Sequence, residues 1–150
     1  MEDENIHLYQ QIEASYQRRM ETLAPLRERE RYAVQGDVSD CNLFVTEDGG
    51  IGLFDFNRCG DNILFCDAVM QGVFESRLMD YDRELTETYS EELFTRFLRG
   101  YHSVKPFSDT EISMIPHMYA IITAFWMDRD GLPPLEQIAE RIDQNLTIDL

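Results

Sequence analysis

Apolar residues in the first part of the chain recur at steps of three and four residues, a spacing that places side chains on one face of an α-helix. This pattern predicts an amphipathic helix over about residues 4–24, and Pro25 is expected to end or bend it. The apolar positions of this face are Ile6, Tyr9, Ile12, Tyr16, Met20 and Leu23.

Two short apolar runs further along, residues 42–46 and 51–54, are typical of β-strands. Residues 47–50, between them, are two acidic residues followed by two glycines, and such residues accept the positive φ of a tight turn. A short extended segment at residues 32–34 precedes the first run. The sequence therefore predicts a small β-hairpin that follows a short strand.

Helical periodicity returns after the hairpin and continues to the end of the chain. The first two predicted helices are residues 62–75 and a helix from Ser90 to near Gly100. The third begins at the capping box of Ser108 and Glu111 and continues to about Met127, with a bend at Pro116. The last helix begins at Pro133 and Pro134, and its apolar face consists of Leu135, Ile138, Ile142 and Leu146.

This order of elements predicts an α+β, mainly α fold in a single domain, residues 1–150. Within it we expect a helical N-terminal segment over residues 1–31, a segment with the hairpin over residues 32–60, and a helical subdomain over residues 61–150.

Composition narrows the class of protein. The chain has 150 residues, 43% of them hydrophobic, which is typical of one globular domain. A net charge of −16 argues against a nucleic-acid partner and is compatible with a cationic substrate or simply with a solvated acidic surface. No apolar run is long enough to span a membrane, the acidic residues 1–5 lack the basic and apolar regions of a signal peptide, and the 3 cysteines form no CxxC pair, so we expect a cytoplasmic protein.

Three polar residues around the predicted hairpin point to chemistry. Asp37 lies five positions before Asn42, and Asp55 lies thirteen positions after it. A carboxylate on a tight loop can act as a general base, while an amide oxygen and a second carboxylate can bind Mg²⁺ together with nucleotide phosphates. We therefore predict ATP- and Mg²⁺-dependent phosphoryl transfer, with Asp37 as the base and Asn42 and Asp55 as metal and cofactor ligands.

Each of these residues also has a purely structural interpretation. Asp37 could be a turn residue and Asn42 could cap the hairpin, whereas an acid within the apolar stretch around Asp55 is harder to explain structurally. The acids between residues 79 and 92 could line a cleft for a cationic substrate or form a solvated loop. The histidines share no ligand spacing, and we expect His7, His102 and His117 to be structural or surface residues.

These motifs resemble the aminoglycoside phosphotransferase and choline kinase-like family, which shares the protein kinase fold. The family signature is HGDxxxxN followed by an Asp-containing strand, and residues 35–42 and 54–56 match it in order and spacing. Two looser similarities are Gly60-Asp61 followed by Asp67-Ala68, and the segment Phe97-Leu98-Arg99-Gly100-Tyr101.

The resemblance implies that the chain is the C-terminal, large lobe of a kinase-like fold, with a hydroxyl-bearing small molecule as phosphate acceptor. It also implies the roles given above for Asp37, Asn42 and Asp55. Two departures are Gln35, where the family usually has His, and Asn57, where protein kinases have the glycine of DFG. The side-chain amide of Gln35 could still bond the backbone, and neither departure removes the base or a metal ligand.

The small lobe that supplies a phosphate-binding Lys and a glycine loop in such kinases is not visible in the sequence. No lysine precedes Lys105, and the first glycine is Gly36. We therefore expect little activity from this chain alone, with the small lobe as a missing partner. The alternatives are a non-catalytic module that binds a partner or self-associates through its exposed lobe face, and a metal-dependent hydrolase, for which no second acid cluster is present.

Overall fold

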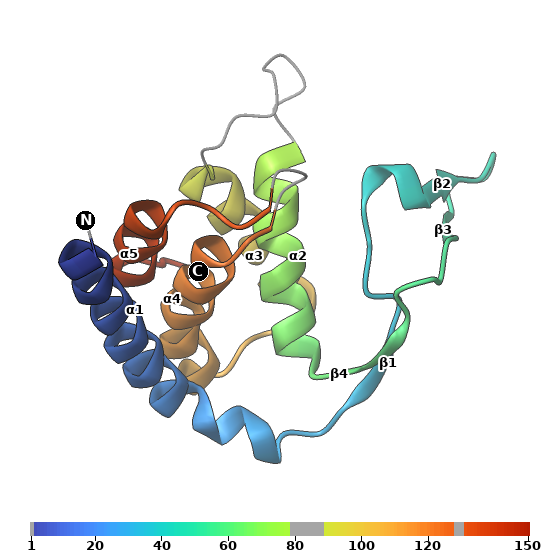
Figure 1. The fold of residues 1–150 in the computed structure, drawn as a ribbon. Helices are drawn as coiled ribbons and strands as arrows, with labels where there is room; N and C mark the ends of the chain where they lie inside the picture. Colours follow the sequence, from blue (N-terminus) through green and yellow to red (C-terminus); the bar gives the residue numbers. More distant parts are fainter. Residues whose placement is uncertain (1, 79–88, 128–130) are drawn as a thin grey trace.

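The computed structural model describes residues 2–78, 89–127 and 131–150 (Figure 1). Five α-helices in this part of the chain pack into a helical body, from which residues 32–62 project as an arm (Figure 1). The helices are α1 (Glu2–Leu23), α2 (Leu64–Leu78), α3 (Glu91–Val104), α4 (Asp109–Ala124) and α5 (Leu135–Asp143). The strands are β1 (Tyr32–Val34), β2 (Leu43–Val45), β3 (Ile51–Leu53) and β4 (Gly60–Asn62).

The central helix of the body is α4, which contacts α1, α2 and α5. Its N-terminus carries the predicted capping box, in which Ser108 and Glu111 satisfy each other's backbone N–H groups. Two clusters of buried apolar side chains form the core on its faces. The larger cluster joins α2, α3 and α4 and includes Val69, Phe94, Leu98, Ile115 and Tyr119; the smaller joins α1, α4 and α5 and includes Ile12, Ala124, Ile138, Ala139 and Ile142.

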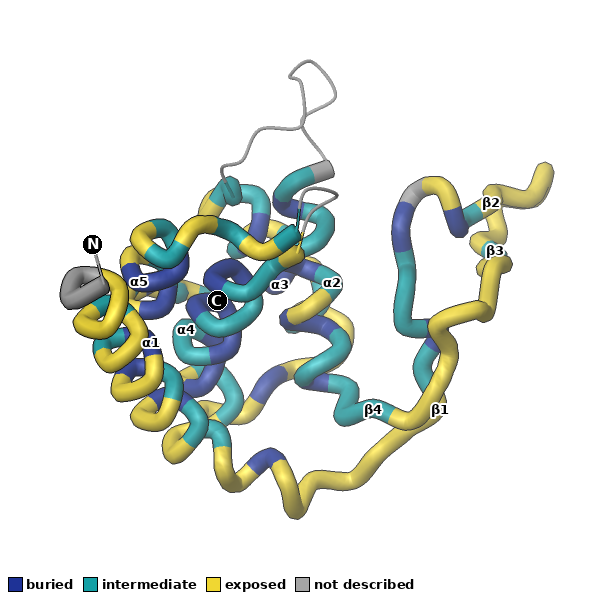
Figure 2. The backbone as a smooth tube through the Cα atoms, in the orientation of Figure 1, coloured by how far each residue is buried: buried dark blue, intermediate teal, exposed yellow. Residues whose placement is uncertain are grey.

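The arm is built from two antiparallel strand pairs. β1 pairs with β4, with Tyr32 opposite Asn62, and this pairing closes the arm at its base beside α2. Inside the closed segment, β2 pairs with β3 as the predicted hairpin, and Gly49 in its turn has φ +83°. Figure 2 shows that most of the arm is exposed, with buried positions confined to the loop between β1 and β2.

Most of the predicted elements are present, but several boundaries differ. The predicted mainly α, α+β fold is confirmed, and β4 is an additional strand that the sequence did not predict. Asn42 ends a short 3-10 helix rather than beginning β2. α4 ends at Ala124, before the predicted Met127, and α5 ends at Asp143, so that Leu146 lies beyond the helix although it is buried.

The acids predicted to line a cleft or form a solvated loop between residues 79 and 92 fall mostly on residues 79–88, which lie outside the described part of the chain. Within the described part, no helix has both the length and the apolar character needed to cross a membrane.

Candidate active site

The loop between β1 and β2 brings two of the three predicted site residues into direct contact. The side-chain Nδ2 of Asn42 donates to the backbone oxygen of Asp37 at 2.8 Å and to its carboxylate Oδ2 at 3.3 Å. Asn42 is buried, and its backbone N–H donates to the oxygen of Ser39. The five-residue spacing seen in the sequence therefore closes a loop in which the amide of Asn42 holds the backbone and the carboxylate of Asp37.

Gln35 connects this loop to the segment that carries Asp55. Its side-chain oxygen accepts from the backbone N–H of Asp37 at 2.7 Å. Its Nε2 donates to the backbone oxygens of Phe54 at 3.1 Å and Asp55 at 2.7 Å. Because Gln35 is 8% exposed, these three bonds lie where water competes little. One side chain thus fixes the backbones of the predicted base and of the predicted metal ligand relative to each other.

Gly36 allows the same two segments to approach closely. Its φ is +80°, in the left-handed region that favours glycine, and a Cβ placed there would lie 2.4 Å from the backbone oxygen of Arg58. A further link is the backbone N–H of Phe54, which donates to the oxygen of Asn42 at 3.1 Å. Glycine is therefore required at position 36 because the backbone just after the second motif, at Arg58, approaches it closely.

Asp55 lies two residues beyond β3 in a conformation that is rare for a residue with a side chain. Its φ is +55°, and its Oδ1 accepts from the backbone N–H of Asn57 at 3.2 Å, a local bond of the kind Asp makes in turns. The side chain is exposed. An outlying backbone angle at an exposed acid is the kind of local strain that is found at functional sites.

The helical body holds the loop through α2. The side chain Nε2 of Gln71 donates to the backbone oxygen of Val38, which follows Asp37 directly. Ser39, next in the chain, is 1% exposed. Sequence reasoning missed Gln71 and Arg58, since neither belongs to a motif and their contacts with this loop span 33 residues in one case and 22 in the other.

One more acid, which belongs to the looser family similarity of residues 60–68, lies near the arm. Asp67 lies in the first turn of α2, and burial raises the pKa of its carboxyl, while a hydrogen bond involving Asn62 lowers it. As for the histidines, His102 Nδ1 accepts from the backbone N–H of Phe107, which is a structural role, and burial and the charge of Arg19 lower the pKa of His117. Their positions on α3 and α4 are in the helical body, away from the loop of Asp37.

Two side-chain oxygens remain available beside this loop. Because Asn42 uses Nδ2 to bind Asp37, its Oδ1 makes no hydrogen bond with the described residues, and the same holds for the second carboxylate oxygen of Asp55. Over the described residues, no cluster of three or more His, Cys, Asp or Glu side chains could hold a metal ion. The donor set therefore suits a cation that takes one or two oxygen ligands from protein and others from phosphate or water.

Comparison with known proteins identifies a family. The family model described as "Phosphotransferase enzyme family" matches residues 2–107, which include α1, the whole arm, α2 and α3. This match confirms the family resemblance that the two motifs indicated. No curated protein and no solved structure gave a match.

Proposed function

Because this chain belongs to the phosphotransferase enzyme family, we propose that its arm carries the base and the metal ligands of an ATP- and Mg²⁺-dependent phosphoryl transfer to a hydroxyl of a small molecule. In this proposal Asp37 is the base, Asn42 and Asp55 are the Mg²⁺ ligands, and the helical body with its arm is the large lobe of a kinase-like fold. The observation that carries the proposal is the bridge of Gln35, which ties the base segment to the ligand segment.

The donor set fits magnesium. Mg²⁺ binds oxygen ligands and usually keeps several waters or phosphate oxygens beside one or two protein groups. The free Oδ1 of Asn42 and the free carboxylate oxygen of Asp55 would supply those protein groups. When bound, the ion with its nucleotide would neutralise the charge that develops on the transferred phosphoryl group.

The chain's own part in the reaction is to position a base. Asn42 holds the Asp37 carboxylate through its Oδ2, which leaves the other carboxylate oxygen able to accept a proton from an acceptor hydroxyl. Gln35 and Gly36 keep the backbone that leads into Asp37 fixed against the Asp55 segment. Since this chemistry depends mainly on positioning, a loop held at both ends by partly buried hydrogen bonds suits it.

A metal titration tests the proposed ligands without requiring turnover. In the presence of ATP, Mn²⁺ as a paramagnetic substitute should broaden amide resonances of residues 37–55 before those of the helical body. Asp55→Ala and Asn42→Ala should weaken this binding by about tenfold or more. The control is Asp61→Ala, which removes an exposed acid on β4 and should change little. Equal affinity in Asp55→Ala and the unaltered chain would contradict the assignment.

We also propose that the 150-residue chain by itself has little or no kinase activity. No lysine precedes Asp37 in this sequence, whereas this class of phosphotransferase places a lysine on the nucleotide phosphates from the small lobe. The supporting result would be Mg²⁺-nucleotide binding without turnover. Stoichiometric ATP turnover by the purified chain that disappears in Asp37→Ala would overturn this proposal while supporting the site.

A second candidate is a non-catalytic module that binds a partner or itself. The observation in its favour is the exposed apolar surface of the arm, where Val45 and Ile51 are each 74% exposed. The other exposed apolar side chains of this surface are Phe44, Leu53, Phe54 and Phe56. This candidate requires association and no metal, so the titration above separates it from the first.

A further inference from the structure

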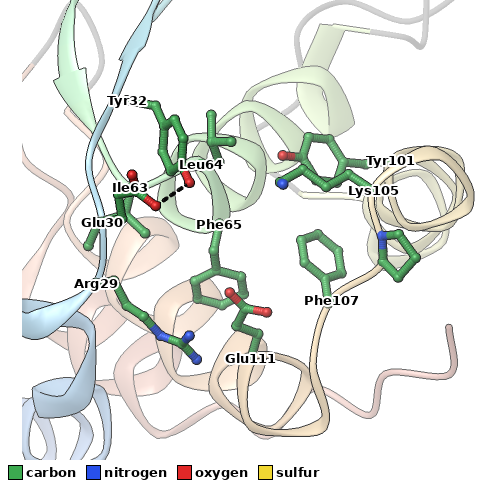
Figure 3. A pocket seen from close by; sticks show the side chains of 11 residues that line it. Arg29, Glu30, Tyr32, Ile63, Leu64, Phe65, Tyr101, Lys105, Phe107 and Glu111 are labelled. Carbon is green, nitrogen blue, oxygen red and sulfur yellow. Dashed lines mark hydrogen bonds between the residues drawn. The ribbon is translucent and has the colours of Figure 1, made fainter.

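A cavity of about 190 Å³ lies at the end of the β1–β4 pair that is opposite to Asp37 (Figure 3). One wall comes from the base of the arm, with Arg29 and Glu30 before β1 and residues 63–65 after β4. The other wall comes from the end of α3 and the start of α4. The residues predicted for phosphoryl transfer do not line it, so the cavity is a separate feature of the fold.

The floor of the cavity is aromatic. Phe107 is buried, its ring stacks on Tyr101 with ring centroids 5.2 Å apart, and Phe65 meets it edge-on at 5.7 Å. Figure 3 shows the side chains of Arg29 and Lys105 on opposite sides of the Phe65 ring. A flat apolar group of a ligand would find ring faces and edges here, which favour another aromatic ring in an offset or edge-on arrangement.

Three donor groups of the cavity have no partner among the described residues. Within the described part of the chain, the guanidinium of Arg29, the ammonium of Lys105 and the hydroxyl of Tyr101 make no hydrogen bond or ion pair. Burial raises the pKa of Tyr101, with further contributions from Asp67 and Glu111, so its hydroxyl keeps its proton and can donate.

The two carboxylates of the cavity, in contrast, already accept hydrogen bonds. Glu30 accepts from the hydroxyl of Tyr32 at 2.6 Å. Glu111 accepts from the backbone N–H and the hydroxyl of Ser108, both at 2.8 Å, as part of the capping box of α4. One oxygen of each carboxylate is thus hydrogen-bonded, while the two cations and the Tyr101 hydroxyl are not bonded to any described residue, so the cavity can bind an acceptor group of a ligand.

We propose that this cavity binds a small aromatic carboxylate, with its ring against Phe65 and Phe107 and its carboxylate at Lys105 and Tyr101. A carboxylate suits the site better than a phosphate, because the second negative charge of a phosphate would be repelled by Glu30 and Glu111. Nothing in this inference depends on phosphoryl transfer, so it stands or falls separately from the proposed function.

The test is a titration of the ¹⁵N-labelled chain with probes of one shape and different charge. Benzoate should shift the amide resonances of Phe65, Tyr101 and Phe107 saturably, with a millimolar dissociation constant typical of so small a ligand. Benzyl alcohol, phenyl phosphate and benzylamine should bind more weakly. Tighter binding of benzylamine or phenyl phosphate, or no saturable shift with benzoate, would overturn the proposal.

Substitutions of charged residues test whether benzoate binds in this cavity. Lys105→Gln should weaken benzoate by about fivefold, as expected for the loss of one solvent-accessible charged contact, whereas Arg29→Gln, on the other side of Phe65, should weaken it less. Arg27→Gln removes an exposed arginine of the same segment that does not line the cavity, and should leave the affinity unchanged. Circular dichroism would verify that each variant is folded. If all three variants bind benzoate as the unaltered chain does, the carboxylate is not held in this cavity and the proposal fails.

Discussion

The side-chain amide of Gln35 forms hydrogen bonds with three backbone groups, and it accepts one of these bonds and donates the other two. Its oxygen serves the N–H of Asp37, and its NH₂ group serves the carbonyls of Phe54 and Asp55. A neutral histidine, which the aminoglycoside phosphotransferase and choline kinase-like family usually has at this position, also offers a donor and an acceptor. Gln35 therefore keeps the polarity that the two motifs need while removing a group that would titrate near pH 6.5.

Gln35→Glu tests this polarity with almost no change of shape. A carboxylate cannot donate to the two carbonyls, so we expect the segment of Asp55 to open more easily, by about 1–3 kcal/mol. The measurement is amide hydrogen exchange at Phe54, whose N–H bonds to Asn42 and should exchange at least about fivefold faster. Gln17→Glu, on the exposed side of α1, adds the same charge and should leave that exchange unchanged. Unchanged exchange in Gln35→Glu would contradict the bridge.

Two glycines with nearly the same φ allow the cost of backbone strain to be measured separately from the cost of a steric clash. Gly36 and Gly49 have φ +80° and +83°, but a Cβ at Gly36 would meet the oxygen of Arg58, whereas a Cβ at Gly49 would meet nothing within 4 Å. Gly49→Ala should cost about 1–2 kcal/mol from the backbone alone. Gly36→Ala should cost more and displace the turn at Arg58, which would appear as shifted amide resonances over residues 54–58. Equal effects of the two changes would show that the close approach at Gly36 is unimportant.

At the scale of elements, α1 is held to α5 by an arginine as well as by apolar contacts. Arg19 is 7% exposed and donates to the backbone oxygens of Ile142 at 2.6 Å and Gln144 at 2.7 Å. These carbonyls lie at the C-terminal end of α5, where a helix leaves its oxygens without internal partners. The first helix of the chain thereby completes the hydrogen bonding of the last.

Two adjacent arginines on α1, one buried and one exposed, allow a controlled comparison of their contributions to stability. Arg19→Met should lower the free energy of unfolding by about 2–4 kcal/mol, because it leaves two carbonyls at the end of α5 without a donor. Arg18→Met removes a mostly exposed ion pair with Asp143, with N–O distance 3.4 Å, and should cost less than about 1 kcal/mol. Urea unfolding followed by circular dichroism measures both. A cost for Arg18→Met as large as that for Arg19→Met would contradict the difference in burial.

The sequence predicts the elements that local signals determine. The capping box of Ser108 and Glu111 is confirmed, as is the hairpin turn that contains Gly49, because both depend on residues a few positions apart. β4 was missed because glycine, aspartate and asparagine have low strand propensity, and Gly60–Asn62 is extended only through its pairing with β1.

The same distinction applies to the candidate site. The contact of Asn42 with Asp37 follows from a spacing of five residues, and the sequence predicts the two to act together. The bridge of Gln35 to Asp55 spans 20 residues, and the bond of Gln71 to Val38 spans 33. Contacts of that range depend on how the arm is placed on the body, which no local pattern determines.

At the scale of the whole molecule, apolar surface is unevenly distributed. The helical body encloses two buried clusters of apolar side chains. The arm is mostly exposed (Figure 2), and six of its exposed residues between Phe44 and Phe56 are large and apolar. Among the described residues β2 and β3 form a sheet of two strands, so each has an edge without a strand partner there. Exposed apolar side chains on unpaired strand edges favour pairing with another chain.

We therefore expect the purified chain to self-associate through the arm in a concentration-dependent way. Light scattering coupled to size-exclusion chromatography should show a molar mass that rises above 17.6 kDa as the concentration increases. Val45→Thr combined with Ile51→Thr should shift this rise to higher concentration, since both side chains are 74% exposed on the hairpin. Val104→Thr, at an 87% exposed position on α3, is the control for a general change in surface polarity. A chain that stays monomeric at all concentrations, with saturable Mg²⁺-nucleotide binding, would argue against the arm as an association surface and for its role as a catalytic segment.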